Sequence, residues 1–230
     1  MPRKALLGGL SPRSTWNTVM GERMEQVSGG TGSDAGVTET LHLYATLLRE
    51  SPHNLLSPRG LEELEGRHFP ESLAFSAGLP VGPRLLDLGS GGGLPGIVIA
   101  ASRPDLQVHL LDATRKKTDF LTEAAQKLGL SVEVHHGRAE QLAGGPLAGT
   151  FDLVTARAVA PLERLVPWAA PFLKVGGQLH AIKGERWSEE LEASEAELRR
   201  RGMIVRSTPN GAPPDRAKGT PLVIVLERTH

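Results

Sequence analysis

A glycine-rich loop between a strand pattern and a helix pattern constrains the fold more than any other feature of the chain. Residues 84–88 read RLLDL, as a buried strand would, and the sequence from Asp87 to Gly96 is DLGSGGGLPG. Gly91, Gly93 and Gly96 satisfy the G-x-G-x-x-G spacing, which is informative where a strand precedes it and a helix follows. Glycine lets the backbone turn tightly and approach a ligand closely. The pattern predicts a ligand site at the carboxyl end of the first strand, and a merely tight turn is the alternative.

Apolar segments alternate with helical patterns along the rest of the chain. Strands are expected at residues 84–88, 107–111, 131–135, 151–155 and 177–182, and helices at 96–102, 115–128, 160–173 and 187–201. This alternation, with its short connections, predicts a mostly parallel sheet with helices on both faces. Two further apolar runs, 203–205 and 222–226, are joined by a segment too short for a crossover helix, which suggests a hairpin. We therefore expect an α/β fold with a seven-stranded sheet whose last strand is antiparallel.

The first 80 residues have a different character. Residues 1–36 contain the segment SGGTGS and no sustained apolar period, so we expect a flexible extension. Residues 37–80 carry apolar positions at helical spacing, and Ser57-Pro58 has the pattern of an N-cap followed by proline at the first helical position. The chain is thus predicted to consist of an extension (1–36), a helical lead-in (37–80) and an α/β domain (81–230).

Composition excludes several classes of protein. The 26 Lys and Arg cancel the 26 Asp and Glu, so any nucleic-acid contact must come from a local patch. The absence of cysteine excludes a disulfide framework, a thiolate metal site and a cysteine nucleophile, and it fits a reducing compartment. No apolar run approaches the roughly 18 residues that span a bilayer, and no secretion signal is recognisable. We expect a cytoplasmic protein without membrane contact. His68 shows no metal-ligand spacing with the other histidines, so we expect no metal.

Asp87 favours one nucleotide-type ligand over another. A dinucleotide places its pyrophosphate over the helix N-terminus, where a neighbouring carboxylate is unfavourable. S-adenosylmethionine carries a sulfonium and an ammonium and no phosphate, so an acid beside the loop attracts it. Pro95 also removes one amide donor, which an anion site would need. Both details favour S-adenosylmethionine, and a nicotinamide-dependent oxidoreductase remains the alternative.

Two further positions fit a nucleoside. Asp112 ends the second strand 21 residues after Gly91, at the position where a carboxylate accepts hydrogen bonds from ribose hydroxyls. The alternative is that Asp112 caps the following helix. Ala139 and Glu140 lie in a polar turn after the third strand, where this kind of fold commonly meets the adenine.

The chain resembles ribosomal small-subunit methyltransferase G, the family also called glucose-inhibited division protein B, from about Leu41 to its end. The most specific matches are the segment Asp87–Gly96 with its Leu-Pro-Gly ending and the sequence Arg157-Ala158-Val159-Ala160. Further matches are Asn54-Leu55, Arg67-His68, Glu71-Ser72-Leu73, Leu111-Asp112, Lys116-Lys117, Phe120-Leu121, Arg138-Ala139-Glu140 and Ala181-Ile182-Lys183-Gly184. The family often has Trp-Asn before its Asn-Leu element, Asp at the position of Glu71 and Arg at that of Lys117, so this chain departs from the pattern at these points.

The resemblance implies a Rossmann-like class I S-adenosylmethionine-dependent methyltransferase. Members of the family methylate N7 of one guanine in 16S ribosomal RNA, guanine 527 in the usual rRNA numbering. Carried over, the resemblance implies that the cofactor contacts Gly89, Leu94, Ala139, Glu140 and Arg157. With the residues indicated by the loop and strand pattern, the expected cofactor-binding set is Asp87, Gly89, Gly91, Gly93, Leu94, Asp112, Ala139, Glu140 and Arg157.

The chemistry implied by that family needs no general base. Guanine N7 carries an in-plane lone pair and no proton, so alignment of N7 with the methyl group should dominate catalysis. We name no catalytic residue. Residues expected to position RNA and guanine are Arg67, His68, Lys116, Lys117, Arg157 and Lys183, although each could instead be an ordinary solvated side chain. The expected partner is 16S rRNA in the small ribosomal subunit, with the protein a monomer. A non-catalytic ribosome-assembly factor that binds RNA is the second alternative.

Overall fold

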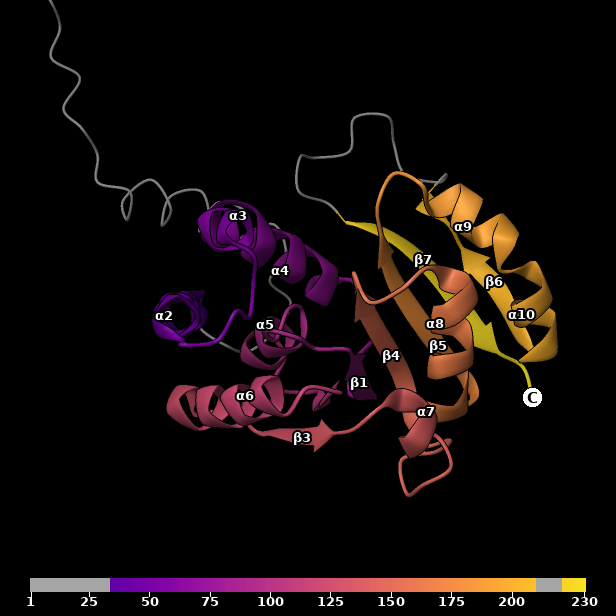
Figure 1. Cartoon of the computed structure of the whole chain (residues 1–230), viewed down its shortest axis with the longest axis horizontal. Coiled ribbons are helices and arrows are strands. Elements are labelled where there is room, and N and C mark those ends of the chain that lie inside the picture. Colours follow the sequence, from indigo (N-terminus) through magenta and orange to yellow (C-terminus); the bar gives the residue numbers. More distant parts are fainter. Residues whose placement is uncertain (1–33, 210–220) are drawn as a thin grey trace, which may run out of the picture.

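The computed structural model describes residues 34–209 and 221–230, which form one seven-stranded sheet. Helices pack around this sheet (Figure 1). The strand order is β3-β2-β1-β4-β5-β7-β6. Strands β1 to β5 pair in parallel, whereas β7 pairs antiparallel with both β5 and β6. The predicted α/β architecture with an antiparallel last strand is therefore confirmed.

Strand positions agree closely with the sequence pattern. The strands are β1 Arg84–Leu88, β2 Gln107–Asp112, β3 Val132–His136, β4 Phe151–Arg157, β5 Leu173–Lys183, β6 Met203–Ser207 and β7 Leu222–Arg228. The largest difference is at β5, which begins four residues before the predicted start at 177. The preceding helix ends earlier than expected because Pro171 has no amide hydrogen to continue the helical ladder.

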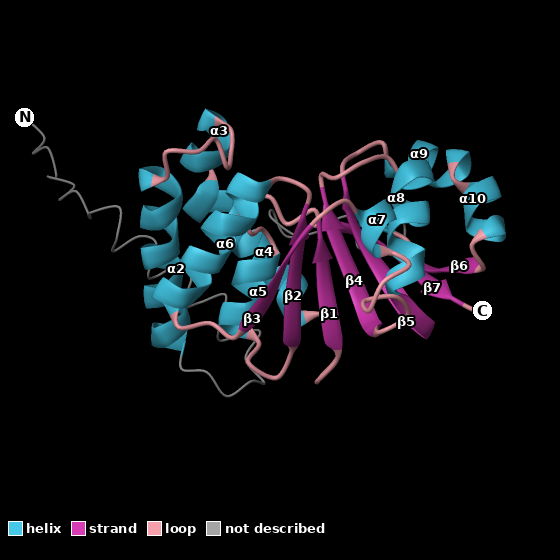
Figure 2. Ribbon diagram, turned by 60° about the horizontal axis from the view of Figure 1, so that its bottom comes forward, coloured by secondary structure: helices cyan, strands magenta, loops and turns pink. Residues whose placement is uncertain are grey.

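Helices cover both faces of the sheet (Figure 2), and a separate apolar cluster lies beneath the helices on each face. The helices after β1 are α5 Gly96–Ser102, α6 Arg115–Leu128, α7 Ala139–Leu142, α8 Leu162–Ala169 with the 3-10 turn η2 Ala170–Phe172, α9 Trp187–Ala193 and α10 Glu195–Arg200. The helix expected over 187–201 is thus two helices that meet at the buried Ser194. Residues on β1 alternate between the faces: Leu85 packs with α5 and α6, whereas Leu86 and Leu88 pack in the cluster on the opposite face.

The predicted lead-in is helical and packs into the main core. It comprises α2 Asp34–Glu50, α3 Pro58–Glu62, the π-helical turn η1 Leu64–His68 and α4 Phe69–Ala77. The first helix begins three residues before the expected position, and the extension over 1–33 lies outside the described residues. Ser57 caps α3 as predicted, because its Oγ accepts a hydrogen bond of 3.1 Å from the Gly60 amide. Leu41 and Leu64 belong to the same apolar cluster as Leu85.

Within the described part of the chain, no helix has the length and hydropathy that crossing a bilayer requires.

Candidate functional site

The glycine loop connects β1 to α5 at the carboxyl ends of the parallel strands, where β2 and β4 also end. Gly89, Gly91 and Gly93 have positive φ angles of 72°, 58° and 91°, a region that L side chains rarely adopt. At Gly93 the space is also closed, because a Cβ would collide with the Tyr44 hydroxyl, with Ile97 and with Leu121. At Gly91 a Cβ would meet only a backbone oxygen at 3.8 Å. The loop is therefore closed at Gly93 and open at Gly91.

Amide hydrogens of this loop are used within the protein. The Gly91 amide donates to Asp112 Oδ2 at 2.9 Å, the Gly93 amide to the Ser90 carbonyl at 2.7 Å and the Gly96 amide to Asp87 Oδ2 at 3.1 Å. Pro95 has no amide hydrogen. A pyrophosphate is normally held by free amides at this position. All three motif glycines have their donors occupied, so the loop suits a ligand without phosphate better than a dinucleotide.

Asp87 lies beneath the loop instead of facing the ligand space directly. It is 1% exposed, and its Oδ1 accepts a hydrogen bond of 3.1 Å from Thr155 Oγ1 while Oδ2 accepts from Gly96. Burial raises the pKa of Asp87 to about 6, against the opposing effect of these hydrogen bonds. The carboxylate thus ties β1, β4 and α5 together.

Asp112 ends β2, and both of its carboxylate oxygens accept hydrogen bonds from backbone amides. Its Oδ1 accepts a hydrogen bond of 2.8 Å from the amide of Thr114, and Thr114, not Asp112, is the N-cap residue of α6. Its Oδ2 accepts from Gly91 and lies 4.0 Å from Lys117 Nζ. Each carboxylate oxygen has a further lone pair, so the residue also retains capacity for ribose hydroxyls.

The segment after β3 differs from the prediction. Ala139 and Glu140 were expected in a polar turn, and they instead form the first turn of the short helix α7. Ala139 is buried and Glu140 is exposed. The Gly137 amide donates to the Asp112 carbonyl at 3.1 Å, which fixes this segment beside the end of β2.

Arg157 at the end of β4 contacts the lead-in. Its Nη1 lies 3.3 Å from His68 Nδ1 and 3.9 Å from Glu71 Oε2. Burial lowers the pKa of Arg157, while Glu71 and Asp87 act in the opposite direction. Arg157 thus joins the lead-in to the carboxyl end of the sheet, where the glycine loop lies.

The turn after Arg157 is strained. Ala158 has a φ of +56°, which is uncommon for a residue other than glycine. This turn places Val159 against the loop, so a Cβ on Gly89 would lie 2.7 Å from Val159 Cγ2. The two sequence motifs that matched the family most specifically are therefore in direct contact.

The remaining basic candidates differ in their surroundings. Arg67 is paired with Glu63 and Glu71 at 2.9 Å each, yet its side chain is about half exposed. Lys116 is exposed at the start of α6, and Lys117 is partly exposed beside Asp112. Lys183 is engaged within the fold: its Nζ donates to the Ala160 carbonyl at 2.6 Å and pairs with Glu190 at 2.8 Å.

Tyr44 is part of this site, although the sequence indicated only a core position on a helix. It is fully buried, and its hydroxyl donates a hydrogen bond to the Gly92 carbonyl in the glycine loop. The two residues are 48 positions apart in the chain. The sequence contains no local signal for such a contact.

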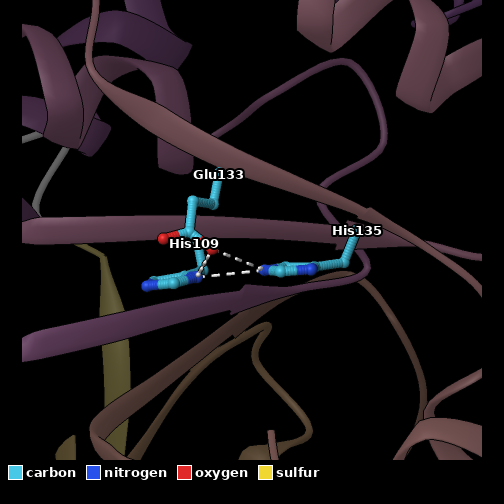
Figure 3. Close-up of side chains that lie close together, drawn as sticks. All are labelled: His109, Glu133 and His135. Atoms are coloured by element: carbon cyan, nitrogen blue, oxygen red, sulfur yellow. Dashed lines mark hydrogen bonds and ion pairs between the residues drawn. The ribbon is translucent and has the colours of Figure 1, made fainter. Parts of the chain in front are cut away.

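A separate cluster of His109, Glu133 and His135 lies on β2 and β3 (Figure 3). Its three facing atoms are 3.0 to 3.9 Å apart, a spacing that could also hold a metal. Arg84 Nε donates to His109 Nε2 at 3.0 Å, so the His109 proton resides on Nδ1, which donates to His135 Nε2. Burial lowers the pKa of His109 to about 4, consistent with a neutral ring. Hydrogen bonds therefore account for the cluster, and the absence of a metal stays a prediction.

Comparison with solved structures defines the fold. The structure is similar to the TehB-like SAM-dependent methyltransferase from Corynebacterium glutamicum, with a TM-score of 0.54 and 19% identity over 74% of this chain and 94% of that chain. The sheet order, the reversed β7 and the glycine loop after β1 make this a Rossmann-like fold of the class I S-adenosylmethionine-dependent methyltransferases.

Sequence comparison identifies the family. Residues 37–217 match the family model described as rRNA small subunit methyltransferase G. Curated relatives with that name include one from Sorangium cellulosum (44% identical, 79% of this chain and 80% of the relative) and one from Mycolicibacterium vanbaalenii (41% identical, 67% and 69%). Other relatives are covered over somewhat less than two thirds of their length. The chain belongs to this family and is an enzyme that methylates small-subunit ribosomal RNA with S-adenosylmethionine.

Proposed function

We propose that this enzyme methylates N7 of a single guanine in 16S rRNA, guanine 527 in the family's usual numbering, as a cytoplasmic monomer that acts on the small ribosomal subunit. The observation that carries the cofactor assignment is the internal use of the loop amides at Gly91, Gly93 and Gly96. The choice of a ring nitrogen is supported by the segment after β4. That segment reads Arg157-Ala158-Val159-Ala160, without the Asn/Asp-Pro-Pro pattern of enzymes that methylate amino groups.

The cofactor would lie across the ends of β1, β2 and β4. Gly89, Gly91, Gly93 and Leu94 would form its floor, and Asp112 would accept hydrogen bonds from the ribose. Ala139 and Glu140 would border the adenine, and Arg157 would close the side toward the lead-in. When bound, S-adenosylmethionine supplies an electrophilic methyl group on a positively charged sulfur.

The protein's own contribution to the reaction is alignment and charge. Guanine N7 needs no deprotonation, so holding N7 in line with the methyl group can contribute on the order of 7–11 kcal/mol. Transfer moves positive charge from sulfur to guanine. The buried carboxylate of Asp87 favours a cation on either partner, and Asp112 adds to the same field.

RNA would approach from the lead-in and the start of α6. Arg67, His68, Lys116 and Lys117 are the side chains that we assign to this approach. His68 lies beside Arg157 at the end of β4, and Lys117 lies beside Asp112 at the end of β2. Lys183 would act from within, holding the Ala160 carbonyl after β4. A nicotinamide enzyme is disfavoured by the occupied loop amides, whereas a non-catalytic assembly factor would share all these RNA contacts.

A methyl-transfer assay separates these functions. Small subunits from a strain that lacks this modification, and naked 16S rRNA as a second substrate, are incubated with the enzyme and methyl-labelled S-adenosylmethionine. We expect label in 16S rRNA, and chain cleavage by borohydride and aniline at one guanine. RNA binding without label would support the assembly factor and contradict the proposal. Label at an amino group or at another base would contradict the N7 assignment.

A further inference from the structure

Tyr44 connects the lead-in to the glycine loop at one atom. The side chain is 0% exposed, and its hydroxyl donates to the carbonyl oxygen of Gly92. The ring is held on its other side by Phe69 of α4, with ring centroids 5.8 Å apart and an interplanar angle of 18°. Two lead-in helices therefore fix the position of the hydroxyl.

Gly92 lies at the point where the loop most needs such a restraint. It is the middle of three consecutive glycines, and its neighbours both adopt positive φ angles. Glycine loses more conformational freedom on ordering than any other residue. The amides of Gly91 and Gly93 are already fixed by Asp112 and Ser90. The hydrogen bond from Tyr44 fixes the carbonyl of the peptide between Gly92 and Gly93, and so completes the restraint on the loop.

We propose that Tyr44 is a positioning residue for S-adenosylmethionine: its hydroxyl holds the glycine loop in the binding conformation before the cofactor arrives. This inference rests on the proposed role of the loop as the floor of the cofactor site. Preorganisation improves affinity because the free energy of ordering the loop is already provided in the free enzyme. Burial and the nearby Asp87 keep the pKa of Tyr44 above its usual range, so the hydroxyl remains a donor over the working pH range.

The test is the variant Tyr44→Phe, which removes the oxygen and keeps the ring that stacks on Phe69. We expect the Kd for S-adenosylmethionine, measured by calorimetry, to rise about tenfold, because a buried carbonyl loses its donor and the loop loses its restraint. The KM for S-adenosylmethionine should rise by a similar factor. The kcat at saturating cofactor and the KM for the small subunit should change less than twofold.

Leu41→Val is the matched control. Leu41 is also fully buried on α2, about one turn before Tyr44, and has no hydrogen bond to the loop. This variant should lower the melting temperature without changing the Kd for S-adenosylmethionine. Hydrogen exchange of the loop without cofactor gives a second measurement, because exchange at Gly91 and Gly93 should accelerate in Tyr44→Phe only.

The possible results are distinguishable. An unchanged Kd in a folded Tyr44→Phe protein overturns the inference, and so does equal weakening in Tyr44→Phe and Leu41→Val, since that result indicates general destabilisation. If the unmodified enzyme fails to bind S-adenosylmethionine, the assignment of the loop fails instead. If Tyr44→Phe does not fold, loop exchange in Phe69→Leu, which removes the stacking ring, decides the question. Unchanged loop exchange in that variant contradicts the inference.

Discussion

The side chain of Asp87 has two roles that conflict with each other. It organises the turn through hydrogen bonds with Thr155 and Gly96, and its buried carboxyl group lies beneath the loop that we propose as the site of a cationic cofactor. Its folded pKa of about 6 lies above the value of 3.8 for the unfolded chain. The charged form is therefore penalised in the folded state, on the order of 3 kcal/mol at neutral pH, and this penalty is relieved as the pH falls from about 6 to 4.

The pH dependence of cofactor affinity follows from this pKa. Protonation of Asp87 removes the charge that attracts the sulfonium, so the Kd for S-adenosylmethionine should rise several-fold between pH 7.5 and pH 5. S-adenosylhomocysteine lacks the sulfonium charge, so its Kd should change less over the same range. Calorimetry across the pH range tests this, and Asp87→Asn should show a flatter profile for S-adenosylmethionine. Equal pH profiles for both ligands would contradict the role of Asp87.

Sequence reasoning located the residues of the loop but not what holds them. The spacing along the chain indicates Gly91, Gly93 and Asp112, because it reflects a local turn and one strand-to-strand step, whereas Gly89 follows only from the family resemblance. Tyr44 was not accessible, because its partner depends on how α2 packs against α5 and α6. The hydrogen bond between His109 and His135 is not predictable from the sequence for the same reason, since the pairing of neighbouring strands brings the two rings together.

The lysines at the start of α6 and the lysine at the end of β5 have different surroundings. At the start of α6, Lys116 and Lys117 face solvent or Asp112, and cations there oppose the helix dipole, which suggests a reason other than stability. Lys183 at the end of β5 is 8% exposed at its side chain and holds Glu190 of α9. Lys116 at the start of α6 is accessible to a ligand, whereas Lys183 uses its charge to join β5 to α9.

Salt dependence of RNA binding distinguishes the two elements. Lys116→Ala should weaken binding to 16S rRNA and lower the slope of log K against log salt by about 1, with little change in melting temperature. Lys183→Ala should leave the slope unchanged and lower the melting temperature, because Glu190 loses its ion-pair partner and keeps only the Leu162 amide. A reduced slope in Lys183→Ala would show that its ammonium reaches phosphate after all.

Element boundaries followed the sequence where caps and apolar periods mark them, as at Ser57 and along β1. They deviated where tertiary packing decides. The short helix α7 begins at Ala139 because that side chain is buried in the cluster beneath α8. The turn at Ser194 interrupts a run of helix-forming residues and buries Ser194 between α9 and α10. Neither feature has a periodicity that a single sequence reveals.

The lead-in and the α/β part of the molecule share one apolar core. Leu64 of η1 is fully buried in the cluster that contains Leu85 of β1 and Ile97 of α5. The division at residue 80, predicted from the change in the spacing of apolar residues, is thus a change of secondary structure within a continuous core.

Cooperative unfolding tests this continuity. Leu64→Ala should lower the free energy of unfolding by about 2–5 kcal/mol in a single transition, because it opens a cavity in the shared core. In a Trp16→Phe background, tryptophan fluorescence reports on Trp168 and Trp187, which pack against the opposite cluster, and it should give the same midpoint as circular dichroism. Val166→Ala, in the opposite cluster, should shift the same transition. Separate midpoints for the two signals would show that the lead-in unfolds on its own.

The position of β7 between β5 and β6 has a consequence for the order of synthesis. On the ribosome, β6 emerges before β7, yet β6 has no pairing partner other than β7 in the described sheet. Until residues 222–228 are made, the backbone groups along one edge of β5 stay unpaired, and the apolar residues Ile224 and Leu226 are missing from the cluster beneath α8 and α10. An open, apolar strand edge can pair with other chains. Until β7 pairs with them, β5 and β6 are thus open to misassembly with other chains.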